Sequence, residues 1–140
     1  RNIQSIKDGT ILSNYSGDVV QPWVSPSDIA SAIAEEMESP FDKRTIRYIA
    51  SEEISGNEIA KILGKAIDNP ELKWIQISDQ DLLKGMLSAG MNEQIARGFI
   101  EMQAAQGNGT LYQDYYKNEP ALSKTKFTDF AQEFAKAYKQ

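Results

Sequence analysis

Capped helix starts recur along this chain and restrict its fold more than any other feature. Ser25 and Asp28 stand three residues apart before an apolar stripe, and Ser55 and Glu58 repeat the pattern. In such a capping box the serine oxygen accepts a backbone N–H, and the acidic side chain reaches back to the N–H of the serine. Asp28 is therefore expected to be the reciprocal partner in its own cap. The expected helices lie at about 26–38, from Ser55 to near Ile67, between Ser78 and Gly90, between Asn92 and Gly107, and at about 126–139.

Each expected helix carries apolar residues at helical spacing. Ile29, Ile33 and Met37 follow one another at intervals of four, so they share one face of the first helix. We expect this face to be buried. The last helix carries a stripe of aromatic residues and one alanine that we also expect to be buried: Phe127, Phe130, Ala131, Phe134 and Tyr138.

Short segments rich in β-branched and aromatic residues separate the helices. Because these segments alternate with helices after residue 19, the fold class is predicted to be α/β or α+β, with a small sheet and about five helices. The stretch 107–123, which is rich in Tyr, Asn and Gly, is the best candidate for a functional surface loop. The expected strands cover 10–15, 19–24, 45–50 and 72–77.

The composition excludes several kinds of site. The 140 residues include no Cys and no His, so a disulfide, a zinc site, a thiolate nucleophile and a His-based triad are all excluded. Twenty acidic residues outnumber fifteen basic ones, the net charge is −5, and no basic block is present, so we expect no nucleic-acid partner. No apolar run approaches the roughly 20 residues of a membrane helix. We expect no metal site, no membrane contact and a cytoplasmic location.

The sequence lacks the common motifs for cofactor binding and catalysis. The sequence has no G-x-G-x-x-G and no P-loop, and we read the Gly-rich turn at 107–109 as a plain turn. A Tyr-x-x-x-Lys pair is also lacking, because Tyr112 precedes Tyr116, and Tyr115 precedes Glu119, at that spacing. The tyrosines are therefore interpreted as packing or as an aromatic wall. Two readings stay open for Trp23, which could cover the edge of the core or line a substrate site.

Three runs of the chain carry a resemblance to a known family. They are the run QPWVSPSDIASAI, the run RYIASEEISGNEIAKILG, and a final helix beginning Thr-x-Phe-x-x-Phe. Together they resemble the C-terminal portion of the NmrA-like proteins, which are atypical short-chain dehydrogenases/reductases. The resemblance implies an N-terminal Rossmann domain that binds NAD(P) and a smaller C-terminal domain that selects the substrate. Residues 1–140 would be that C-terminal substrate-binding domain. Since the chain begins with Arg1, we expect the Rossmann domain upstream.

The resemblance also assigns candidate site residues. We expect Asn2, Gln21, Trp23, Tyr112 and Tyr115 to face the pocket between the two domains, with no catalytic and no cofactor-binding residue on this chain. At the position of Gln21, related nucleotide-sugar epimerases carry an arginine that binds the substrate phosphate. A neutral amide cannot form that charge-assisted pair, so a nucleotide-sugar substrate is disfavoured.

The implied function is the substrate-binding domain of an NAD(P)-dependent oxidoreductase that reduces a small organic acceptor such as a quinone. NAD(P) would be bound by the full-length parent, and the isolated chain would be inactive. The alternative is a domain of a non-catalytic, NAD(P)-binding redox sensor, and a third reading is a free-standing interaction module. The expected partners are a small-molecule substrate, held together with the missing Rossmann domain, and a second copy of the chain through the exposed interdomain face.

Overall fold

The computed structural model describes residues 3–40 and 43–139. The α-helices are α1 (Ile3–Lys7), α2 (Pro26–Glu38), α3 (Gly56–Ala66), α4 (Asp79–Ser88), α5 (Glu93–Gly107), α6 (Gln113–Asn118) and α7 (Phe127–Tyr138), and a 3₁₀ turn, η1, covers Thr110–Tyr112. The strands are β1 (Thr10–Ser13), β2 (Val20–Trp23), β3 (Glu52–Ser55) and β4 (Lys73–Gln76).

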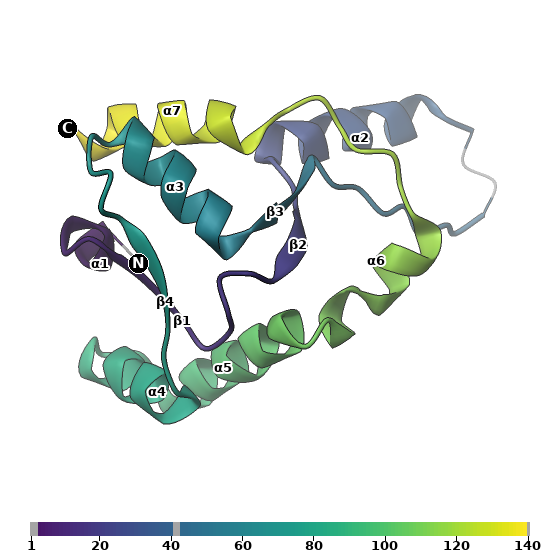
Figure 1. The fold of residues 1–140 in the computed structure, drawn as a ribbon. Helices are drawn as coiled ribbons and strands as arrows, with labels where there is room; N and C mark the ends of the chain where they lie inside the picture. The colour runs from purple at the N-terminus through teal and green to yellow at the C-terminus, as the bar shows by residue number, and fades with distance from the viewer. Residues whose placement is uncertain (1–2, 41–42, 140) are drawn as a thin grey trace.

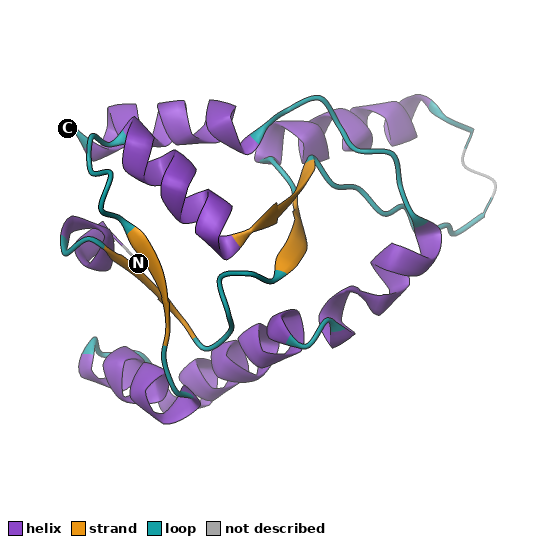
Figure 2. Cartoon of the chain, in the orientation of Figure 1, coloured by secondary structure: helices purple, strands orange, loops and turns teal. Residues whose placement is uncertain are grey.

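Two small sheets lie between two groups of helices. β1 pairs in parallel with β4, and β2 pairs antiparallel with β3. Helices α4 and α5 lie along one side of the sheets, and α2, α3 and α7 lie along the other (Figure 1). The mixed architecture, coloured by element type in Figure 2, confirms the predicted fold class. In the described part of the chain no helix is both long enough and apolar enough to cross a membrane.

The core lies between α3, α7 and the strands. Phe127 is 3% exposed, and its ring meets the ring of Trp23 edge-on at a centroid distance of 5.2 Å. Phe130, Phe134 and Tyr138 are partly buried against the same core, so the buried stripe expected on the last helix is confirmed. The fully packed members of the core are Ile6, Ile11, Ile54, Ala60, Leu63, Ile67, Leu72, Phe127, Ala131 and Ala135.

The predicted helix starts are present. Ser55 and Glu58 form the full capping box, in which the serine oxygen accepts the N–H of Glu58 and the Glu58 carboxylate accepts the N–H of Ser55. Ser78 and Asn92 cap α4 and α5. Gly90 has a φ of 81°, the left-handed conformation expected of a residue that follows a helix.

Asp28 differs from its predicted role. The oxygen of Ser25 does cap α2, but the backbone N–H of Ser25 donates to the hydroxyl of Ser51 rather than to Asp28. The Asp28 carboxylate instead accepts hydrogen bonds from the hydroxyls of Ser51 and Thr125. It therefore joins the start of α2 to the segment before β3 and to the segment before α7, and the Ser51 hydrogen bond lowers its pKa most.

This junction predicts a pH dependence of stability. Because the pKa of Asp28 is lower in the folded protein than in the unfolded chain, its contribution is present above the unfolded pKa of about 3.9 and is lost as pH falls through the folded pKa. Asp28→Asn should therefore lower the urea midpoint at about pH 7 and have much less effect at about pH 3. An equal loss at both pH values in urea titrations would contradict the assignment.

Two segments differ from the sequence predictions. The expected strand at 45–50 is wrong, since only Ala50 forms an isolated bridge there and Ile46 is exposed. The strand β3 begins at Glu52 and pairs with β2. Just before it, the backbone N–H of Ser51 donates to the carbonyl of Trp23. The stretch 107–123 also contains η1 and α6 rather than a continuous loop.

The apolar face of α2 is the largest departure from prediction. Ile29, Ile33 and Met37 are 38%, 56% and 82% exposed, although they were expected to be buried. Helical spacing shows that these side chains share a face but not what covers that face. No described residue of α2 is fully buried, so this face is open in the chain as it stands.

Candidate functional site

An open cavity of about 440 Å³ lies where β2 meets η1 and α6. We call it the aromatic pocket. Four of its nine lining residues have aromatic rings, and Asp114 is the one that carries a charge. The lining residues are Pro22, Trp23, Val24, Tyr48, Ile49, Leu111, Tyr112, Asp114 and Tyr115.

The two readings of Trp23 both hold in part. Its indole packs against Phe127 and Phe130 at centroid distances of 5.2 and 5.9 Å, so it covers the edge of the core. The same residue also lines the aromatic pocket. Core packing holds the indole in place, which gives the pocket one rigid wall.

Gln21 lies behind the pocket and is 8% exposed. Its amide Nε2 donates to the hydroxyl of Tyr15 at 2.7 Å, and its Oε1 accepts from the hydroxyl of Tyr112 at 3.4 Å. The Tyr112 hydroxyl also accepts from Nε2 of Gln106 at 3.1 Å. Gln21 therefore links β2 to η1 and to α5. It positions a wall of the pocket and is not among the residues that line it.

Tyr115 is buried on the inner side of α6, and its hydroxyl donates to Oε1 of Glu53 at 3.2 Å. Burial and the neighbouring Glu53 carboxylate raise the pKa of Tyr115 to about 12, so the phenol stays protonated at neutral pH. The hydroxyls of Tyr112 and Tyr115 are both hydrogen-bonded within the protein. Ring surface is thus what these two residues chiefly offer a ligand.

The structure brings three of the five predicted site residues together around one cavity. Trp23, Tyr112 and Tyr115 line one cavity, and Gln21 touches that cavity through Tyr112. Asn2 lies outside the described residues. Glu53 and Tyr15 were not among the predicted residues, because the sequence does not show that Glu53 meets Tyr115 or that Tyr15 meets Gln21.

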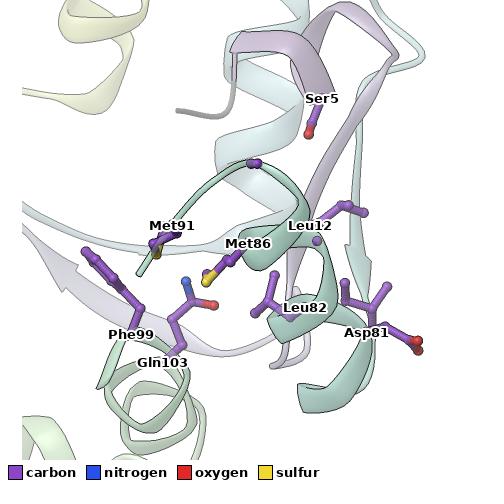
Figure 3. Close-up of a pocket in the computed structure, with 11 residues that line it drawn as sticks. Ser5, Leu12, Asp81, Leu82, Met86, Met91, Phe99 and Gln103 are labelled. Atoms are coloured by element: carbon purple, nitrogen blue, oxygen red, sulfur yellow. The ribbon is translucent and has the colours of Figure 1, made fainter. Parts of the chain in front are cut away.

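A second cavity of about 480 Å³ was not expected from the sequence. It lies between β1 and the α4–α5 hairpin, and its labelled side chains come from all of these elements (Figure 3). We call it the methionine pocket. The lining residues are Ser5, Leu12, Ile77, Asp81, Leu82, Gly85, Met86, Ala89, Met91, Phe99 and Gln103.

Four of the described helix starts are poor sites for a dinucleotide phosphate, and no described acidic cluster fits a metal ion. A dinucleotide phosphate needs free backbone N–H groups at a helix start. At α2, α3, α4 and α5 a side-chain oxygen already accepts a first-turn N–H, and each first turn carries an acidic residue. Among residues 3–40 and 43–139 no group of three or more Asp, Glu, His or Cys residues could hold a metal.

Comparison with solved structures gives a clear likeness. Two solved structures of Citrobacter sp. triphenylmethane reductase match, with TM-scores of 0.75 and 0.73 and sequence identities of 18% and 20%. Each match covers 96% of this chain and 47% of the reductase chain. This chain has the fold of one part of triphenylmethane reductase.

Triphenylmethane reductase is described as acting on triphenylmethane dyes, and one of the two structures is a complex with NADP(H). Our chain spans about half the length of that reductase, and a C-terminal part of such a protein fits this coverage. The likeness agrees with the resemblance carried by the sequence motifs. At 18–20% identity it establishes the fold alone. No protein-family model matches the sequence. No curated protein matches it either.

Proposed function

We propose that this chain is the substrate-binding part of a longer NAD(P)-dependent oxidoreductase that reduces a small organic acceptor such as a quinone. The observation that carries the proposal is the match over 96% of the chain to a reductase solved with NADP(H). Because the starts of α2, α3, α4 and α5 are already capped, the nicotinamide cofactor would be held by the part of the protein outside this chain.

The aromatic pocket supports this division of roles. Its rings can hold a flat apolar acceptor, while the Gln21 network holds Tyr112 in place. Nothing in this arrangement requires a proton donor or a nucleophile from the chain. The role assigned to these residues is therefore binding and orientation.

The open face of α2 supports the existence of a covering partner. Ile29, Ile33 and Met37 form an exposed apolar stripe. Together with Arg47 and other residues, they line a cavity of about 440 Å³. The Arg47 guanidinium is held by the carboxylates of Glu35 and Glu36 at 2.7 and 2.9 Å. We assign this face to contact with the remainder of the longer protein, because the matched reductase is about twice as long as this chain.

Turnover by the longer protein tests the proposal. With quinones, aldehydes, azo compounds and triphenylmethane dyes as acceptors, NAD(P)H consumption should rise for at least one class. Leu111→Trp, which places an indole into the aromatic pocket, should raise the KM for that acceptor about tenfold or more and leave the KM for NAD(P)H unchanged.

Leu122→Trp is the matched control. Leu122 is 46% exposed, against 47% for Leu111, and it does not line the aromatic pocket. Its kinetics should match those of the parent. If the protein binds NAD(P)H but consumes it with none of the acceptors, the redox-sensor alternative is favoured. If the two variants have equal KM values for the acceptor, the aromatic pocket is not the acceptor site.

A further inference from the structure

The methionine pocket has the chemistry of a ligand site. Its volume of about 480 Å³ falls in the range of roughly 300–1,000 Å³ typical of small-molecule sites. Met86, Met91 and Phe99 line it and lie near one another (Figure 3). Thioether sulfur is polarizable and makes favourable contacts with aromatic rings. These walls favour a flat aromatic molecule.

The pocket is also nearly free of charge. Asp81 is its one charged lining residue, and the carboxylate accepts a hydrogen bond from the hydroxyl of Ser78 at 2.7 Å. That carboxylate points away from Met86 and Phe99 (Figure 3). A charged ligand would lose its hydration here without gaining an opposite charge, so an uncharged ligand is favoured.

Gln103 supplies one directional polar group. Its Oε1 accepts the hydroxyl of Ser13 at 3.3 Å. Its Nε2 donates to no described residue, and the amide lies beside Met86 and Phe99 (Figure 3). The Ser13 contact orients the amide, which leaves two N–H donors for a ligand.

We propose that the methionine pocket binds a small, uncharged aromatic molecule bearing one hydrogen-bond acceptor, with Nε2 of Gln103 donating to that acceptor. This site is separate from the aromatic pocket, because the two cavities share no lining residue. The inference does not depend on the proposed function.

A matched pair of bicyclic probes tests it on the 140-residue chain. 1-Tetralone carries a carbonyl where tetralin carries a methylene. In NMR titrations 1-tetralone should shift the methyl signals of Met86 and Met91 and leave those of Met37 and Met102, which do not line the pocket, in place. It should bind roughly three- to tenfold more tightly than tetralin, the gain of one net hydrogen bond.

Two pairs of variants localise the effect. Gln103→Glu keeps an acceptor for Ser13 and removes the N–H donor, so it should abolish the preference for 1-tetralone while tetralin still binds. A Cβ added at Gly85, which lines the pocket, would meet nothing within 4 Å, and the same is true of Gly98, which does not line it. Gly85→Leu should abolish binding of both probes, and Gly98→Leu should retain it.

Several results would overturn the proposal. These are equal affinity for the two probes, no binding of either, or binding that survives Gly85→Leu. A dimer in sedimentation that Gly85→Leu dissociates would assign the pocket to a second copy of the chain instead. None of these measurements uses NAD(P)H, so their failure is distinct from a failure of the turnover experiment.

Discussion

Phe127→Ala is expected to lower the free energy of unfolding by about 3–5 kcal/mol, the usual loss for truncating a buried phenylalanine. Phe127 is 3% exposed and lies between Trp23 and Phe130 at centroid distances of 5.2 and 5.5 Å. Its backbone N–H donates to the Glu52 carboxylate at 2.8 Å, and alanine keeps that bond. The measured loss therefore reports the ring alone.

Urea unfolding followed by tryptophan fluorescence measures this loss. The emission of Trp23 should also shift to longer wavelength, because the cavity left by the ring lets water approach the indole. Phe99→Ala is the matched control, since Phe99 is 39% exposed and lies on an α-helix, where alanine is favourable. A loss below about 1 kcal/mol for Phe127→Ala would contradict the described core.

Gly64→Ala is expected to destabilise the protein by about 1–3 kcal/mol through overpacking. A Cβ at Gly64 would lie 2.6 Å from the backbone carbonyl oxygen of Asn69 and 3.1 Å from Cβ of Leu72. The Gly64 carbonyl also accepts the N–H of Asn69 at 2.8 Å, so the turn after α3 cannot move away without losing that bond. Backbone has to shift to admit the methyl group.

Gly98→Ala is the control for this effect. Gly98 also lies inside an α-helix, but a Cβ there meets nothing within 4 Å. Alanine should stabilise the protein by about 0.5–1 kcal/mol, because it has the higher helix propensity. Thermal unfolding should therefore move the melting temperature in opposite directions for the two variants. Equal shifts would show that the contact between Gly64 and Asn69 does not restrict the chain.

The candidate site was partly accessible from the sequence. Trp23, Tyr112 and Tyr115 were chosen by resemblance, and the structure places all three around one cavity. Gln21 was expected to face that cavity but is buried behind it, because its amide meets Tyr15 and Tyr112. The methionine pocket could not be anticipated, since it needs β1 to lie against the α4–α5 hairpin.

The hydrogen bonds of Asp28 were only partly predictable from the local sequence. The sequence placed it correctly in the first turn of α2 behind the Ser25 cap. Its carboxylate then bonds to Thr125, which is 97 residues away along the chain. A capping motif indicates where a helix begins, but not which distant group competes for a side chain in its first turn.

The sequence by itself determined where five helices begin and that helices and short strands alternate. A cap and its partner lie within one helical turn, so that information is local. Only the tertiary structure decided that the apolar face of α7 is buried while that of α2 is open, and that Gly64 is crowded while Gly98 is free. Burial and crowding depend on chain segments that are distant in sequence and brought together only by folding.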